Sequence, residues 1–148
     1  MTKKPQPITI LMADDDPDDR LLTKDALEES RVLNELHFVE DGEELLEYLN
    51  RTGKFADPET SPRPGLILLD LNMPRKDGRQ ALAEIKANPD LRRIPVVVMT
   101  TSSAEEDIFR SYDTGANSFV TKPVTFEQLV SLMRALGRYW IEFVELPS

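Results

Sequence analysis

Two short apolar runs of this chain end in aspartates. Asp14 and Asp15 follow the run Ile8–Ala13, and Asp70 closes the run Leu66–Leu69. A continuous apolar run of this length is typical of a strand buried on both faces of a parallel sheet. A carboxylate at the end of such a strand is costly to desolvate unless something compensates its charge. Asp70 is therefore either a surface acid that happens to follow a strand or the centre of a site.

Two further apolar runs also end in chemically useful side chains. Ile94–Thr100 ends in a hydroxyl, and Ser118–Thr121 is followed by Lys122 and Pro123. In a doubly wound parallel sheet the carboxyl ends of all strands meet at one edge. We therefore expect Thr100 and Lys122 to converge on the three aspartates.

This set of side chains predicts a phosphoryl-transfer site. Clustered carboxylates repel one another, and oxygen ligands without histidine or cysteine favour Mg²⁺, with Mn²⁺ as the alternative. Lys122 would supply a point charge for a phosphate, and Thr100 a hydroxyl donor. Catalysis of phosphoryl transfer depends mainly on positioning and charge stabilisation, and a carboxylate such as Asp70 can form an aspartyl-phosphate.

The elements that would position these residues alternate along the chain. Short strands alternate with amphipathic helices, which predicts an α/β fold whose parallel sheet has helices on both faces. We expect Asp16 and Pro17 to start the first helix, and Asp41, Ser103 and Thr125 to cap later ones. The expected strands are Ile8–Ala13, Glu35–Val39, the run ending at Asp70, Ile94–Thr100 and Ser118–Thr121. The expected helices run from Pro17 to about Ser30, from Asp41, from Gly78 to Asn88, from Ser103 to near Gly115, and from Thr125 onward. In the helix that starts at Asp41, Leu45, Leu46 and Leu49 lie on one face.

Helical spacing also predicts which side chains face the core. In the first helix these are Leu21, Leu22, Ala26 and Leu27. The last helix carries a full apolar stripe, made of Leu129, Leu132, Met133, Leu136, Trp140 and Phe143. With Tyr139 and its neighbours, this tail holds more aromatic surface than one inward face needs, which favours a homodimer. We expect the tract Gly53–Gly65, with its three prolines, to be a long loop.

Composition narrows the class of protein. The chain has 148 residues, a net charge of −9 and no cysteine. A single domain fits this length, and the acidic balance argues against nucleic acid as a partner. Disulfides and cysteine-based metal sites are excluded. No apolar run approaches a membrane span or a signal peptide, so we expect a soluble, cytoplasmic protein.

The motifs together resemble the receiver domain of two-component response regulators. The matching features are the acidic pair, Asp70-x-Asn72-x-Pro74, Thr100 and Lys122-Pro123, in that order. The resemblance covers about residues 8–143 and implies a flavodoxin-like (βα)5 fold with sheet order 2-1-3-4-5. It implies one receiver domain over residues 1–148 with no output domain, which signals by protein contacts.

The resemblance also implies a role for each site residue. Asp70 would accept phosphate from a histidine kinase, and Mg²⁺ would be held by Asp14, Asp15, Asp70 and the backbone carbonyl of Asn72. Thr100 and Lys122 would contact the phosphate, Thr100 and Phe119 would form the switch pair, and the Lys122–Pro123 bond would be cis. Signalling would use the face built from the fourth helix, fifth strand and fifth helix, and Tyr139, Trp140 and Phe143 would serve the dimer or a partner.

A narrower resemblance concerns the sequence around the phosphoacceptor. The tract Arg63–Arg79, the loop before it and Thr100-Thr101-Ser102 are similar to single-domain regulators of bacterial, chiefly cyanobacterial, phytochrome kinases. A sensor histidine kinase of the phytochrome type is thus the expected partner.

Other readings of the same residues remain open. A Mg²⁺-dependent phosphatase of the haloacid-dehalogenase type also uses aspartate and lysine, but it would need an acid where Asn72 stands. A receiver from a non-phytochrome phosphorelay fits the general motif equally well, and a receiver-like scaffold that is never phosphorylated would not need the complete acid set. We expect no enzyme activity beyond the chain's own phosphotransfer and dephosphorylation, and we interpret His37 as an ordinary strand residue.

Overall fold

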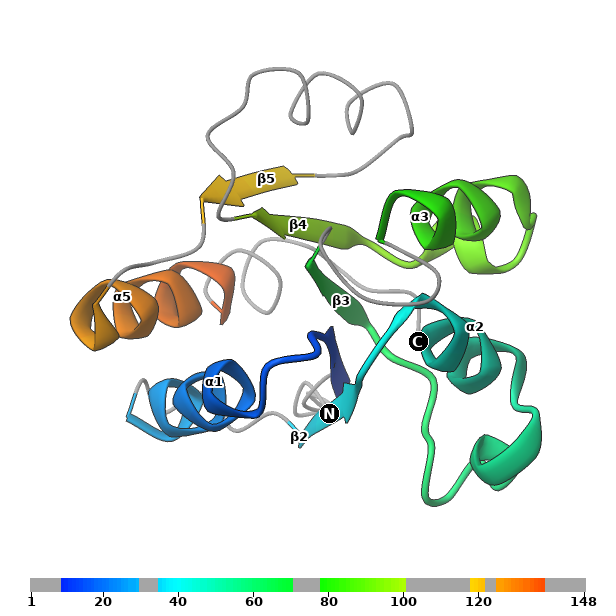
Figure 1. The fold of residues 1–148 in the computed structure, drawn as a ribbon, viewed down its shortest axis with the longest axis horizontal. Helices are drawn as coiled ribbons and strands as arrows, with labels where there is room; N and C mark the ends of the chain where they lie inside the picture. Colours follow the sequence, from blue (N-terminus) through cyan, green and yellow to red (C-terminus); the bar gives the residue numbers. More distant parts are fainter. Residues whose placement is uncertain (1–8, 30–34, 71–77, 101–117, 122–124, 138–148) are drawn as a thin grey trace, which may run out of the picture.

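Five short strands form one parallel sheet (Figure 1). The computed structural model describes residues 9–29, 35–70, 78–100, 118–121 and 125–137, without the side chains of residues 100, 118–121, 136 and 137. The sheet order is β2-β1-β3-β4-β5, which confirms the expected α/β fold and strand order. The strands are β1 (Thr9–Ala13), β2 (Glu35–Val39), β3 (Leu66–Asp70), β4 (Val96–Thr100) and β5 (Ser118–Thr121).

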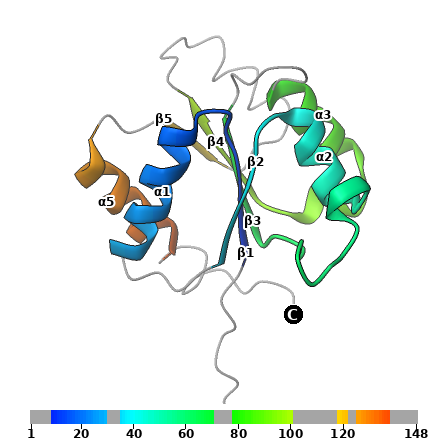
Figure 2. The ribbon, with the colours of Figure 1, turned by 60° about the horizontal axis from the view of Figure 1, so that its bottom comes forward.

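Helices cover both faces of this sheet (Figure 2). On one face α1 (Pro17–Glu29) lies beside α5 (Phe126–Gly137), and on the other α2 (Gly42–Asn50) lies beside α3 (Gly78–Ala87). This arrangement explains why β3 has no polar side chain before Asp70, since all five of its residues are buried. A strand covered on both faces reads as a continuous apolar run rather than an alternating one.

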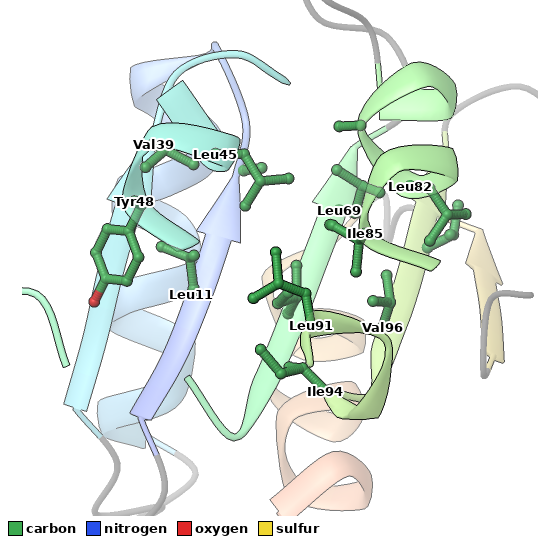
Figure 3. Close-up of a cluster of buried hydrophobic side chains, with 14 residues drawn as sticks. Leu11, Val39, Leu45, Tyr48, Leu69, Leu82, Ile85, Leu91, Ile94 and Val96 are labelled. Carbon is green, nitrogen blue, oxygen red and sulfur yellow. The ribbon is translucent and has the colours of Figure 1, made fainter. Parts of the chain in front are cut away.

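Successive side chains of the strands enter two separate cores. Ile67 and Leu69 pack under α2 and α3, whereas Leu66 and Leu68 pack under α1 and α5. Figure 3 shows the first of these cores, with Leu45 and Leu82 reaching the sheet from their helices. The alternation follows from the two-residue period of a strand, and it fixes the register of β3 because a shift by one residue would exchange the two faces.

Side-chain caps set the starts of the helices as the sequence predicts. The Oδ1 atom of Asp16 accepts a hydrogen bond from the Asp18 amide (2.9 Å), just ahead of Pro17. At α2 the Asp41 carboxylate accepts from the Glu44 amide (2.8 Å), while Glu44 accepts from the Glu40 amide (3.1 Å). At α5 the capping is reciprocal, with Thr125 Oγ1 accepting from the Gln128 amide (3.1 Å) and Gln128 Oε1 accepting from the Thr125 amide (3.4 Å).

The inward face predicted for α1 is partly wrong. Leu21 and Leu22 are 58% and 44% exposed, whereas Ala26 and Leu27 are buried as expected. Thr23 takes the remaining inward position and is 2% exposed. A buried hydroxyl needs a partner, and that of Thr23 donates to the Asp19 carbonyl one turn earlier (2.9 Å).

The face of α2 also differs from the expected leucine face. Leu45 is fully buried, Leu46 and Leu49 are only partly buried, and Tyr48 is 3% exposed. The Tyr48 hydroxyl donates to the carbonyl of Pro62 (2.9 Å) in the long loop. That distant acceptor allows a phenol to occupy a core position.

Element boundaries otherwise lie close to those expected. The strands β2 and β5 match residue for residue, α3 ends one residue earlier than predicted and β4 begins two residues later. The loop before β3 contains a short 3-10 turn, Gly53–Phe55. The helix expected at Ser103 to Gly115 lies outside the described residues. Among the residues described, no helix combines the length and the apolar character needed to cross a membrane.

Candidate functional site

Strand register brings two of the predicted aspartates side by side. Ala13 pairs with Leu69 across β1 and β3, so the next residues along each strand, Asp14 and Asp70, come level. Neighbouring parallel strands lie about 4.8 Å apart. Both aspartates are buried, with exposures of 0% and 7%.

Backbone contacts hold Asp14 at this edge. Its amide donates to the Val39 carbonyl at the end of β2 (3.0 Å), and its Oδ1 accepts from the Asp16 amide (2.9 Å). Val39 thus helps to position the acid cluster, a role that the sequence signalled only through the strand pattern. Because these bonds lock the turn from β1 into α1, the carboxylate of Asp14 has a fixed place at the sheet edge.

The third aspartate completes a compact cluster. Asp14, Asp15 and Asp70 each present a carboxylate oxygen, and these oxygens lie within 4.8 Å of one another. Asp15 is exposed, so the cluster is open to solvent on its side. Three hard oxygen donors at this spacing suit a divalent cation such as Mg²⁺ or Mn²⁺, which would offset their mutual repulsion.

The backbone of β4 reaches the same edge. Asp70 is level with Met99, so Thr100 lies one residue further toward the edge, and it pairs with Thr121 at the end of β5. The side chain of Thr100 is outside the described part of the structure. Phe119 is described only as a backbone position, paired with Val98.

The remaining predicted site residues cannot be placed, because they lie outside the described residues. These are Asn72, Lys122 and Pro123 at the site, with the bond expected to be cis, and Tyr139, Trp140 and Phe143 in the tail. Of the residues predicted to form the metal site, the described structure therefore brings together the three carboxylates.

His37 lies away from this cluster, on the edge strand β2. Its Nε2 atom is 3.1 Å from a carboxylate oxygen of Glu35, and its ring meets that of Tyr48 edge to face with centroids 6.1 Å apart. The ring is thus used in local packing on the α2 side of the sheet. These contacts agree with an ordinary strand histidine.

Comparison with known proteins identifies the family. The model of the response regulator receiver domain matches residues 10–134. Response regulator Rcp1 of Synechocystis sp. is 44% identical over 142 residues, which span 96% of this chain and 95% of Rcp1.

Solved structures give the same result. The phosphorylated cyanobacterial phytochrome response regulator RcpA has 43% identity and a TM-score of 0.88, covering 97% of this chain and 100% of that one. The Mn²⁺-bound form of Rcp1 has 44% identity and a TM-score of 0.84, covering 96% and 100%. RPA3017, a response regulator in red light signalling of R. palustris, has 33% identity and a TM-score of 0.90, covering 97% and 99%.

The acid cluster therefore sits on a known signalling scaffold, at the edge of the sheet where strand ends converge. The family match spans most of the chain, and the matches to Rcp1 and RcpA span nearly all of it. This chain belongs to the receiver domains of two-component response regulators, closely related to response regulator Rcp1 and to the phytochrome response regulator RcpA.

Proposed function

We propose that Asp70 is the phosphoacceptor of this response regulator. The observation that carries the proposal is the convergence of Asp14, Asp15 and Asp70 within 4.8 Å at the carboxyl ends of β1 and β3. An Asp70 carboxylate oxygen would attack the phosphorus of a kinase phosphohistidine. The phosphorus–nitrogen bond would break, and its electron pair would stay on the imidazole.

The acid cluster is the proposed Mg²⁺ site, with the backbone carbonyl of Asn72 as a further ligand. A bound cation would supply positive charge that lets an anionic carboxylate meet an anionic phosphoryl group. The fit of three carboxylate oxygens supports this assignment, as does the Mn²⁺-bound form of Rcp1. Thr100 and Lys122 are the proposed phosphate contacts, and Thr100 with Phe119 the proposed switch pair.

The proposed kinase is a phytochrome, and the proposed location of this protein is the cytoplasm. Support comes from the roles of two relatives, since RcpA is a phytochrome response regulator and RPA3017 acts in red light signalling. Phosphotransfer from a purified phytochrome kinase should be faster than from a kinase of an unrelated sensor class. Equal rates from both kinases would contradict the pairing.

The proposed output is a protein contact made by a single receiver domain. Rcp1 matches this chain over 95% of its own length, which supports a one-domain organisation. The face around β5 and α5 is the proposed signalling surface, and Tyr139, Trp140 and Phe143 are the proposed dimer contacts.

The phosphoacceptor is tested by incubation with acetyl phosphate and Mg²⁺, followed by intact mass measurement. One phosphate should be added, and Asp70→Asn should abolish the addition. Asp25→Asn is the matched control, because it removes an exposed carboxylate from the middle of α1 and should leave the addition unchanged. Undiminished labelling of Asp70→Asn would overturn the assignment.

A further inference from the structure

A second candidate site lies at the opposite edge of the sheet. A cavity of about 320 Å³ opens between the end of α2, the loop before β3 and the segment before β4. Pro64 and Ile94, which line it, stand just ahead of β3 and β4. The acid cluster is at the other end of these strands, roughly 17 Å away for five residues of strand.

Part of the floor of this cavity is apolar, and this part is small because its side chains are almost fully buried. Leu91 and Ile94 line it and are 4% and 3% exposed. Figure 3 shows both beside the starts of the strands, away from the arrowheads. Tyr48 forms another wall, held by its hydrogen bond to Pro62 (2.9 Å) and by packing against Phe55, with ring centroids 5.2 Å apart.

One guanidinium group is held in place at the rim. Arg63 donates from Nη1 to the Asp90 carboxylate (2.9 Å) and from Nη2 to the Asp90 carbonyl (3.0 Å). Both residues line the cavity. These two bonds use part of the donor set of Arg63 and restrain its orientation, so it loses little further entropy when it binds a ligand.

Two other polar side chains in the cavity wall have unused donors. Ser61 is 4% exposed, and its backbone amide is bonded to the Asp57 carbonyl (2.9 Å). Within the described part of the chain its hydroxyl makes no hydrogen bond. Arg51 likewise has no ion-pair partner among the described residues, although it lines the same cavity.

The charged side chains that line the cavity favour an anion. Two arginines and one aspartate line it, in a protein whose net charge is −9. The positive charge of Arg51 lowers the pKa of Tyr48, but burial and the Glu35 carboxylate have larger opposite effects, and the net pKa is raised to about 12. Guanidinium groups match carboxylate and phosphate oxygens in geometry as well as in charge.

We propose that this cavity binds a small organic anion. Its carboxylate or phosphate group would lie among Arg51, Ser61 and Arg63, and its apolar part would lie against Leu91 and Ile94. The volume is at the lower end of the range for small-molecule sites, which fits a ligand the size of a substituted aromatic ring. The site is separate from the proposed phosphoacceptor, so neither assignment depends on the other.

The test is an NMR titration of the full chain with phenyl phosphate and, separately, benzoate. EDTA is present, so that no cation at the acid cluster attracts the probe. At least one probe should shift the amides of Ser61, Arg63 and Leu91 in a saturable way, with a Kd of about 1 mM or tighter. The amides of Asp15 and Leu69 should not follow the same curve. Benzamide, which is neutral, should bind about tenfold more weakly, because it lacks the charge that the arginines recognise.

Variants distinguish binding in this cavity from nonspecific attraction of the anionic probe to positive charge on the surface. Arg51→Gln should weaken binding about tenfold, and Ser61→Ala should weaken it less, since it removes a neutral donor. Arg92→Gln is the matched control, because Arg92 is exposed nearby and does not line the cavity. This variant should bind the probe with a Kd within about twofold of that of the unaltered protein.

Three results would overturn the proposal. The first is the absence of saturable shifts at the cavity with both probes up to about 10 mM, an affinity too weak for a built site. The second is equal binding of benzamide and the anions. The third is equal weakening by Arg51→Gln and Arg92→Gln, with both variants giving the amide spectrum of a folded protein.

Discussion

At the scale of single residues, the fold holds the three carboxylates of the acid cluster close together, so their negative charges cannot move apart. Asp14 and Asp70 are buried beside each other because strand register makes them level, and Asp15 adds a third carboxylate. Like charges at such distances repel strongly when they are partly shielded from water. The cluster should therefore gain more from a divalent cation than an exposed acidic patch would.

Mg²⁺ should consequently raise the melting temperature of the protein. At a hundred times its Kd, a ligand that binds only the folded state stabilises it by about 2.7 kcal/mol, which corresponds to several degrees for a chain of this size. Asp15→Ala should lose most of this gain, whereas Asp25→Ala should keep it. Scanning calorimetry with Mg²⁺ and with EDTA measures both, and an undiminished gain in Asp15→Ala would place the cation elsewhere.

Tyr48 gives a second prediction, concerning alkaline pH. Burial and the Glu35 carboxylate raise the pKa of Tyr48 from its ordinary value of 10.0 to about 12. The stability that this shift contributes is fully present below pH 10 and is lost as pH rises toward 12, because the unfolded state releases the proton first. The loss should be about 2–3 kcal/mol.

Tyr48→Phe removes the titrating group and is the comparison variant. It should be less stable near neutral pH, because it gives up the hydrogen bond to Pro62, but the difference between the two proteins should shrink between pH 10 and 12. Lys86, whose pKa is lowered by burial, titrates in both proteins and cancels in the difference. Urea unfolding at fixed pH values measures the free energy of unfolding of both proteins. A difference between them that stays constant from pH 10 to 12 would be inconsistent with this account.

At the scale of elements, the end of α2 carries a residue in an unfavourable conformation. Arg51 has a φ of 56°, in the left-handed region, and its amide caps the helix through the Tyr48 carbonyl (3.2 Å). A side chain with a Cβ atom is disfavoured there, and helices commonly end on glycine at this position.

Arg51→Gly should therefore stabilise the protein by about 0.5–1 kcal/mol, as measured by urea unfolding. Asn50→Gly, one residue earlier and within the helix, should have the opposite sign, because glycine there adds only entropy to the unfolded chain. Destabilisation by both substitutions would show that the Arg51 side chain contributes more than its backbone strain costs.

The elements also show what sequence alone could predict. The strand ends, the caps at Asp16, Asp41 and Thr125, and the three clustered carboxylates followed from local patterns, since each depends on residues that are near one another in the chain or on the common edge of a parallel sheet. The inward face of α1 did not follow, because apolar spacing does not reveal that Thr23 can be buried by donating to the Asp19 carbonyl, while Leu21 and Leu22 are exposed.

Tertiary partners explain the other differences. Tyr48 can be a core residue because the carbonyl of Pro62, fourteen positions later, accepts a hydrogen bond from its hydroxyl. The cavity beside Tyr48 depends on three segments that meet only in the folded chain. No periodicity or motif in the sequence signals such a meeting.

At the scale of the whole molecule, the two cores lie beneath different surfaces of the protein. The core under α2 and α3 faces the cavity, whereas that under α1 and α5 lies on the opposite face of the sheet. The aromatic tail with Tyr139, Trp140 and Phe143 follows α5 in the sequence. We expect this tail to form a dimer, which light scattering measures as a doubled mass. Trp140→Ala should weaken it, and Leu21→Ala, which removes exposed apolar surface from α1, is the control that should not. A monomer at high concentration would contradict the dimer.

The central claim, that Asp70 receives the phosphoryl group, is tested most directly by locating the modification in the unaltered protein. The chain phosphorylated with acetyl phosphate and Mg²⁺ is treated with borohydride, which reduces an acyl phosphate to an alcohol and releases phosphate. Peptide sequencing by mass spectrometry should then find homoserine at position 70 and aspartate at positions 14 and 15. Homoserine at another aspartate, with position 70 unchanged, would contradict the account.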